Sequence, residues 1–438
     1  GVCYAWNPYV AERLLIGQWA LLLGYAGLPW VVRVLCTGPE RISMRRLVCA
    51  LIPAAIGGFA AMSVTALAAV PAALVSSRPA RRLAMVLAGL ALLSLPWLIP
   101  ALAVPVHTDP RGVDAFAARA DTPFGRPGSL LLLSGIWNAQ TVPRGYGGGA
   151  SAFWLLVVVA SLCGYVLWAR PRRLRVALMI AALAGLAIAA TVVAGRAALR
   201  DLVAAWPGFA VLRDGQQYLA PLALAEAIGL GALVAWVTAG AQRMAAADRS
   251  PGARSAAAAL GVMAVLAPVV LLPGMAWDMA GRLRPVAYPA DWVRARQVID
   301  GDPAQGSVLL LPWAAYRRYP WNGGEAAFDP WVRFAAREVI SNDALDVGSL
   351  TVAQESADSI RLNRIVTSRG PLTLPLRAAG VLYVVVDQGP LLRRAAALAA
   401  GGPAARTLAA SARLPGAQLV IASRDLVLFR LSRPGRPP

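Results

Sequence analysis

Glu12 and Arg13 stand at the entrance of an apolar run that reaches Trp30. Charges deep in lipid are costly, so in membrane segments they are usually paired or functional. A guanidinium binds phosphate oxygens through a planar set of donors, and a carboxylate accepts hydrogen bonds from sugar hydroxyls. The pair is therefore a candidate contact for a lipid-linked phosphate or a sugar. The alternative is an interfacial helix in which Arg13 extends its charge to water.

A second polar cluster, Arg213, Asp214 and Gln217, lies at the start of the apolar run 218–238. These residue types could hold a lipid-linked phosphate or an acceptor sugar. Alternatively, Asp214 caps the N-terminus of the following helix, where a carboxylate is favoured.

Two further segments carry candidate ligand contacts. Trp137 and Asn138 lie between apolar runs and could line the same outer cavity, or form a packed turn. The segment 313–334 is rich in aromatic residues and includes Glu325 and Asp329. Such a mixed surface can bind sugar rings, although packing of the C-terminal domain onto the membrane domain is the simpler explanation.

Histidine and cysteine are too scarce for several kinds of site. His107 is the single histidine, and no cysteine follows Cys163. A histidine-based zinc site or a Ser-His-Asp triad is therefore not expected, nor is a thiolate metal site in the C-terminal region. We predict no metal site and assign no cofactor, so any catalysis must rest on carboxylates, arginine and neutral polar groups.

The composition is that of a polytopic membrane protein. Of 438 residues, 58% are hydrophobic and only 15% are charged, and several runs of about twenty residues are long enough to cross a bilayer. The net charge is +20, and all 42 basic side chains behind it are arginines. The arginines cluster in short loops between apolar runs, so they indicate membrane topology rather than a nucleic-acid partner.

The predicted spans and their orientation follow from the apolar runs and the loop charges. The runs are 14–32, 47–75, 83–104, 153–169, 176–194, 218–238 and 256–277. The segments 78–82, 170–175 and 239–254 carry arginines and should be cytoplasmic. This places the loops 105–152 and 195–217, and everything after about residue 280, outside the cell.

The run 47–75 conflicts with this orientation, because the arginine-rich loops on both of its sides should be cytoplasmic. Its middle contains Pro53, Gly57 and Gly58. Two half-helices that form a re-entrant hairpin would resolve the conflict, since broken helices occur where protein surrounds the break. The alternative is a single long, tilted helix.

The region after residue 280 alternates helix-like and strand-like segments. We expect helices at 289–299 and 391–400, and strands at 307–312 and 381–387, with two more within 418–431. The predicted fold class is an α-helical polytopic membrane protein of about six to eight membrane segments, followed by an extracytoplasmic α/β domain. The predicted domains are a transmembrane domain at 1–280, an α/β domain at 281–432 and a disordered tail at 433–438.

Four segments resemble a known superfamily. The opening WNPYVAERLLIGQWALLLGYAGLPW, the loop DTPFGRPGSLLLLSGIWNAQTVP, the segment LRDGQQYLAPLAL and the later LRAAGVLYVVVD are similar to actinobacterial membrane proteins of the GT-C glycosyltransferase superfamily. The similarity is to the arabinofuranosyltransferase-like and YfhO-like proteins. It implies a multi-pass plasma-membrane protein that uses a polyprenyl-phosphate-linked sugar at the outer face for assembly of a cell-envelope glycan.

The resemblance also implies a departure from that superfamily. Its catalytic carboxylate usually follows the first transmembrane helix, and this chain, which begins at Gly1, is expected to start after that point. Catalytic residues therefore stay unassigned. A non-catalytic scaffold or glycan-binding protein of the same fold is an alternative. A lipid or glycan transporter is another, against which we count the lack of paired repeats and of intramembrane carboxylates.

Overall fold

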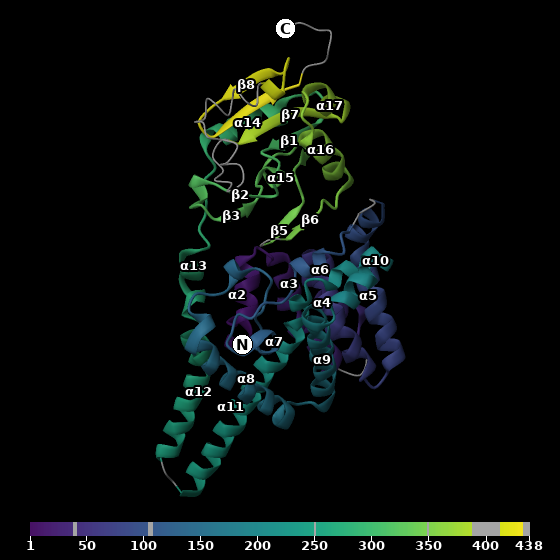
Figure 1. Ribbon diagram of the computed structural model, residues 1–438. Helices are drawn as coiled ribbons and strands as arrows, with labels where there is room; N and C mark the ends of the chain where they lie inside the picture. Colours follow the sequence, from purple (N-terminus) through teal and green to yellow (C-terminus); the bar gives the residue numbers. More distant parts are fainter. Residues whose placement is uncertain (38–41, 104–107, 249–250, 348–349, 388–411, 432–438) are drawn as a thin grey trace. The chain divides into compact units, whose positions relative to one another are not determined.

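The computed structural model describes residues 1–37, 42–103, 108–248, 251–347, 350–387 and 412–431. The chain forms two compact units, which divide near Arg284 and Pro285 (Figure 1). His107, the predicted helix 391–400 and the predicted disordered tail 433–438 lie outside the described residues.

The first unit is helical. Its helices are α1 (Val2–Ala5), α2 (Pro8–Leu15), α3 (Trp19–Cys36), α4 (Met44–Leu74), α5 (Pro79–Ala103), α6 (Gly112–Ala115), α7 (Gly125–Leu131), α8 (Ser151–Trp168), α9 (Arg172–Ala194), α10 (Arg196–Ala205), α11 (Ala220–Asp248), α12 (Pro251–Leu271) and α13 (Ala276–Gly281). Within the described residues, six helices are long and apolar enough to cross a membrane. A seventh span results if α12 and α13, which are bent by 68° at their junction, form one broken span.

Helix α4 is broken at Gly58. The φ of +75° and ψ of −156° at this residue are not helical and are essentially restricted to glycine. The break lies beside the N-terminal end of α3, because a Cβ at Gly57 would meet the carbonyl oxygen of Ala20 at 2.2 Å. The Pro-Gly segment that suggested a re-entrant hairpin is thus the site of the break.

Both ends of α4 lie at the C-terminal end of α3. The Arg82 side chain, in the first turn of α5, donates to the carbonyl oxygen of Leu35 at 2.6 Å. Cys36, the last residue of α3, is near both Arg82 and Arg173. We call this end of the unit the Arg-rich end. A helix that turns back at Gly58 meets the geometric requirement of a re-entrant hairpin, while its insertion into a membrane stays a prediction.

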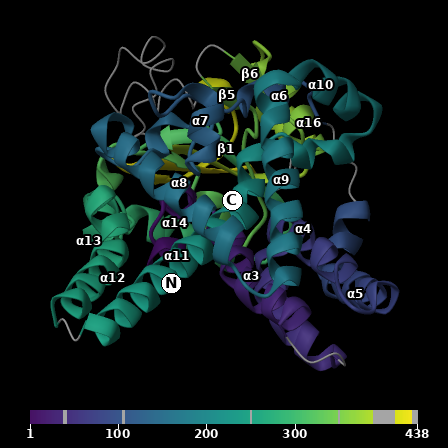
Figure 2. The same cartoon turned by 90° about the horizontal axis from the view of Figure 1, so that it is seen from below.

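Helix α9 connects two groups of helices. It packs against α4 and α11, and Figure 2 shows α4 and α5 on one side of it and α11 and α12 on the other. Helices α8 and α11 approach so closely that a Cβ at Gly164 would lie 2.3 Å from the carbonyl oxygen of Gly229. Small residues permit such contacts between membrane helices.

The opposite end of this unit, which we call the site end, is built from the longer connections. Asp114 in α6 pairs with Arg200 at 2.7 Å and Arg196 at 3.7 Å, both in α10. The indole of Trp6 donates to the carbonyl oxygen of Leu272 at 3.0 Å. These contacts bring the α5–α8 connection close to the α9–α11 connection, and the N-terminal segment close to the end of α12.

The second unit is an α/β domain. Its central sheet has the strand order β4-β1-β7-β9-β8, in which β1 is parallel to β4 and β7, and β9 is antiparallel to β7 and β8. The strands are β1 (Ser307–Leu311), β2 (Tyr316–Arg318), β3 (Ala326–Phe328), β4 (Val339–Ile340), β5 (Leu345–Val347), β6 (Leu350–Val352), β7 (Val381–Asp387), β8 (Gln418–Ala422) and β9 (Leu426–Arg430). The helices are α14 (Ala290–Gly301), α15 (Trp331–Phe334), α16 (Ala357–Thr367) and α17 (Thr373–Ala378).

Helices cover both faces of this sheet. Side chains of α16 and α17, such as Leu362 and Leu376, pack with Val384 on one face. Trp292 of α14 and Trp331 of α15 pack with Val385 on the other. The predicted fold class, a multi-span helical membrane protein followed by an α/β domain, is therefore confirmed. The predicted strands at 307–312, 381–387 and within 418–431 are present.

Candidate functional site

Asn7 and a stack of tyrosines fix helix α2 at the site end. The Asn7 side chain caps α2 by accepting from the backbone N–H of Val10 at 3.0 Å, and Pro8 occupies the first helical position. Its amide also donates to the hydroxyl of Tyr25 in α3 at 3.0 Å. Tyr25 stacks on Tyr9 at 5.1 Å between ring centroids. These contacts set the direction of the next turn, which carries Glu12 and Arg13.

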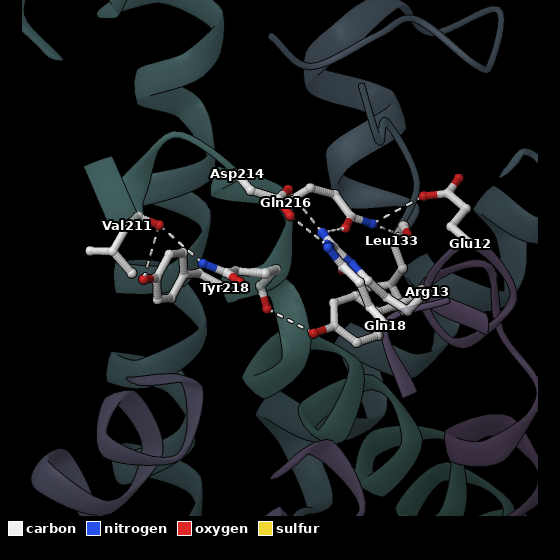
Figure 3. A network of polar contacts seen from close by, with 10 residues as sticks. Glu12, Arg13, Gln18, Leu133, Val211, Asp214, Gln216 and Tyr218 are labelled. Carbon is white, nitrogen blue, oxygen red and sulfur yellow. Dashed lines mark hydrogen bonds and ion pairs between the residues drawn. The ribbon is translucent and has the colours of Figure 1, made fainter. Parts of the chain in front are cut away.

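Arg13 is the centre of a polar network, shown in Figure 3. Its guanidinium makes a bidentate ion pair with Asp214, at 2.6 and 3.1 Å. It also donates to the side-chain oxygens of Gln18 and Gln216. Bidentate, charge-assisted pairs of this kind are the stronger hydrogen bonds in proteins. The structure therefore joins two of the predicted segments, although they are far apart in the sequence.

Neither Glu12 nor Arg13 is at the protein surface. Both are 0% exposed, so the alternative in which Arg13 extends to water is wrong. Because the carboxylate and amides of Asp214, Gln216 and Gln18 occupy the guanidinium, Arg13 holds protein segments together in this structure. A substrate contact by Glu12 or Arg13 stays a prediction.

Glu12 is connected to the same network through Gln216, whose amide donates to it at 3.1 Å. Its other carboxyl oxygen is buried without a partner within the described residues. Burial raises the pKa of Glu12 well above its usual range, and nearby Asp121 raises it further. Arg13 lowers this pKa in part, and the net shift favours the protonated carboxyl.

The second predicted cluster has a different structure from the one that its sequence suggested. Asp214 precedes the short 3-10 turn Gly215–Leu219, but its side chain makes no capping hydrogen bond, so the capping alternative is wrong. Gln217 is buried: its side chain donates to the carbonyl oxygen of Val211 at 3.1 Å, and its backbone carbonyl accepts from Tyr9 at 2.8 Å. Its observed contacts are thus within the protein.

The loop that carries Trp137 is held by Asp121 and Ser129. Asp121 accepts from the backbone N–H of Gly135 at 3.0 Å, and Gly135 has a φ of +89° that favours glycine. The Ser129 hydroxyl accepts from the backbone of Asp121 and Thr122, at 3.1 Å each. Burial raises the pKa of Asp121, which nearby Arg119 partly offsets.

Trp137 and Arg213 both contact Phe116. The Trp137 ring meets Phe116 edge-on at 4.9 Å, and the Arg213 guanidinium lies 4.9 Å from the centre of the same ring. Both side chains are half-buried, and the Trp137 indole nitrogen is a buried donor without a partner within the described residues. Asn138 instead caps a short turn, accepting from the backbone of Gln140 at 2.9 Å.

Three candidate functional residues were not among those predicted from the sequence. Gln216 connects Glu12 to Arg13, and Asp121 orders the Trp137 loop. Polar residues at the ends of apolar runs were the available signal for both. Glu226 lies within α11 and is 1% exposed, with an unpartnered carboxyl oxygen among the described residues. The expectation that intramembrane carboxylates are lacking is therefore wrong.

The aromatic segment of the α/β domain is largely core. Tyr319 and Trp331 are buried. Asp329 pairs with buried Arg317 at 3.0 Å, and Arg317 also pairs with Asp387. Burial raises the pKa of Asp387 to about 7 although Arg317 lowers it. Asp329 is thus unavailable for sugar binding in this structure. No metal-ligand cluster of three or more histidine, cysteine or acidic residues occurs in the described part of the chain.

Comparisons with known proteins connect this architecture to one enzyme. No protein-family model matches the chain, and no curated protein matches it in sequence. The solved structure of arabinofuranosyltransferase AftD from mycobacteria is similar to it, with a TM-score of 0.55 and 17% identity over 99% of this chain. Two structures of a mutant of that enzyme give TM-scores of 0.51 and 0.52 at 16% and 18% identity, over 94% and 99% of this chain.

The likeness covers only part of the larger protein. This chain spans 31–32% of the length of the AftD chains that it matches. At 16–18% sequence identity, the comparison shows a similar fold and nothing about activity. The chain shares the fold of part of that protein, with several helices long and apolar enough to cross a membrane and a following α/β domain.

Proposed function

We propose that this protein is a membrane glycosyltransferase-like protein that binds a polyprenyl-phosphate-linked sugar for assembly of a cell-envelope glycan. The observation that carries the proposal is the fold match to arabinofuranosyltransferase AftD over 99% of the chain. The polar network at the site end supports it, because buried, ordered polar groups at the ends of membrane helices are typical of binding sites for charged ligands.

The orientation of the two ends supports an outer-face site. Arg82 and Arg173 lie at the Arg-rich end, and short basic loops are retained on the cytoplasmic side. The site end, with Arg13 and Asp214, is opposite, because α3 runs from Gln18 to the Arg-rich end. The polar network then faces the side on which lipid-linked sugars are used by the superfamily that the sequence resembles. The C-terminal α/β domain is extracytoplasmic in this arrangement.

Arg213 and Trp137 are the ligand contacts that the geometry favours. Both are half-buried and contact Phe116, so a guanidinium for phosphate lies close to aromatic rings for a sugar. Arg13 and Asp214 are paired with each other, and Arg13 also donates to Gln18 and Gln216. They position the segment that carries Arg213, and Glu12 supports them through Gln216.

Ligand binding in lipid nanodiscs tests the proposal. Radiolabelled polyprenyl-phosphate-linked arabinofuranose should bind the purified chain saturably. Arg213→Gln and Trp137→Leu should each weaken binding at least tenfold, because a charge-assisted phosphate contact or an aromatic stacking contact contributes about 1.4 kcal/mol or more. Arg200→Gln, which removes an ion pair with Asp114 at the same end, should not. The proposal fails if the unsubstituted chain shows no saturable binding.

A non-catalytic glycan-binding or scaffold function is the second candidate. It is favoured by the state of the carboxylates at the site: Glu12 is buried and Asp214 is paired with Arg13, so neither is placed to act as a general base. Saturable binding without transfer of the sugar to a glycan acceptor would support this function. Transfer by the purified chain would exclude it.

A further inference from the structure

A cavity of about 610 Å³ lies at the Arg-rich end, away from the polar network. It is lined by Trp30 and Val34 of α3, by Ser43, and by Arg45, Arg46, Cys49, Ala50 and Pro53 of α4. Its volume is in the range of small-molecule and cofactor sites. The cavity is formed where the C-terminal half of α3 meets the first arm of the broken helix α4.

The cavity is polar at one side and apolar at the other. Arg45 and Arg46 are exposed, and neither side chain has a hydrogen bond or ion pair within the described residues. Ser43 caps α4 by accepting from the backbone of Arg46 at 3.3 Å, so the positive end of the helix dipole adds to the two guanidiniums. Val34, Ala50 and Pro53 supply the apolar lining.

This combination matches an anionic lipid and not a soluble anion. Two guanidiniums provide planar donors for a phosphodiester, and basic pockets between membrane helices on the cytoplasmic side bind phosphate headgroups of lipids. Trp30 is 59% exposed, as expected for an aromatic side chain at the membrane interface. Both helices are candidate membrane spans, so the apolar side of the cavity is continuous with surface that acyl chains contact.

The geometry points to a binding site for an anionic phospholipid, with its phosphate held by Arg45 and Arg46 beside Ser43 and its acyl chain along Trp30, Val34 and Pro53. Such a lipid would fill the space between α3 and the first arm of α4 at the Arg-rich end. This site is separate from the polar network, and its occupancy does not depend on the proposed function.

Cys49 makes the site accessible to experiment, because it lines the cavity and its thiol is exposed. Cys163 is the other exposed cysteine, whereas Cys3 and Cys36 are buried. In a Cys163→Ala chain, the rate of maleimide modification of Cys49 would be compared between nanodiscs of phosphatidylcholine alone and nanodiscs that also contain phosphatidylglycerol. We expect the anionic lipid to slow modification at least threefold.

Substitutions test which arginines are responsible for the protection of Cys49. Arg45→Gln with Arg46→Gln should abolish the protection, and both residues are exposed, so the fold should be retained. Arg78→Gln with Arg81→Gln removes two exposed charges from the same end without altering the cavity lining, and it should leave the protection intact. Equal loss in both double variants would show diffuse surface charge and overturn the site.

Two further outcomes would also overturn it. One is an equal modification rate in the two kinds of nanodisc. The other is full protection by soluble glycerol phosphate in phosphatidylcholine nanodiscs, which would assign the cavity to a soluble phosphate ligand. Retention of phosphatidylglycerol by the purified chain, measured by native mass spectrometry and lost in the Arg45/Arg46 double variant, would support the site independently.

Discussion

At the scale of single residues, Arg13 determines whether the site end is ordered. Its guanidinium is buried and contacts Asp214, Gln216 and Gln18, so it connects α2 to the segment before α11. Removing one partner of a buried charge pair leaves the other charge uncompensated, and this typically costs about 3–5 kcal/mol. Glu12, one residue earlier, is expected to be neutral and so carries no comparable charge.

A matched pair of substitutions tests this difference. Arg13→Gln should lower the free energy of unfolding by about 3–5 kcal/mol because Asp214 loses its partner. Glu12→Gln should change it by less than about 1 kcal/mol, because a glutamine resembles a protonated glutamate and keeps a hydrogen-bonding side chain. Thermal unfolding in detergent measures both. Equal destabilisation by the two substitutions would contradict a neutral Glu12.

The sequence was sufficient to select the candidate residues, but not to predict which residues they contact. Arg13 and Asp214 could be selected because polar residues stand out at the ends of apolar runs. Their ion pair joins segments 201 positions apart, and only the packing of α2 against the α9–α11 connection brings them together. Glu226 was overlooked because a single acid within an apolar run barely changes the hydrophobic pattern. Its burial depends on which side of α11 faces other helices.

At the scale of helices, close backbone contact holds α8 against α11. Gly164 and Gly229 face each other, and a Cβ at Gly229 would lie 1.9 Å from the carbonyl oxygen of Ser161. A Cβ at Gly231, two residues further along α11, would meet no described atom within 4 Å apart from its own chain neighbours and the adjacent backbone of α11. Gly229 thus lies in a tight contact between two helices, whereas Gly231 has open space beside it.

Alanine at these two positions should have opposite effects. Gly229→Ala should destabilise the protein by about 1–3 kcal/mol, because α8 and α11 must separate to admit the methyl group. Gly231→Ala should be neutral or stabilise it by up to about 1 kcal/mol, because alanine is the better helix former. Melting temperatures in detergent compare the two. A Gly229→Ala protein as stable as the Gly231→Ala protein would show that the helices can separate freely.

At the scale of the whole molecule, the break in α4 reconciles the loop charges with one orientation. If α4 crossed the membrane, the arginines around Arg81 would lie on the side opposite to those near Arg45. The break at Gly58 and the Arg82–Leu35 contact place both groups at the Arg-rich end. A single orientation then satisfies the preference of short basic loops for the cytoplasm.

Labelling from either side of the membrane tests this orientation. In a chain without its native cysteines, Thr37→Cys and Ser77→Cys, both exposed, should react only with reagents that reach the cytoplasmic side. Gln140→Cys, also exposed and at the site end, should react from the outside. If Ser77→Cys is labelled from the same side as Gln140→Cys, α4 crosses the membrane.

The fold class followed from the sequence because hydrophobic run length and β-branched strands are local properties. The run 381–387 became the central strand β7, and the apolar runs became the long helices. The short strands β2 to β6 were not predicted, since three-residue strands such as Tyr316–Arg318 carry too little pattern. The bend between α12 and α13 likewise depends on packing rather than on composition.

The broken helix α4 also bears on the order in which the helices enter the membrane. Each arm has about half of its 31 residues, or roughly 23 Å of helix at 1.5 Å per residue, which is less than the ~30 Å hydrocarbon core. Neither arm can therefore be stable in the bilayer alone, and the backbone at Gly58 needs surrounding protein. If both arms enter the membrane as a re-entrant hairpin against α3, that helix must be in place before α4 can insert.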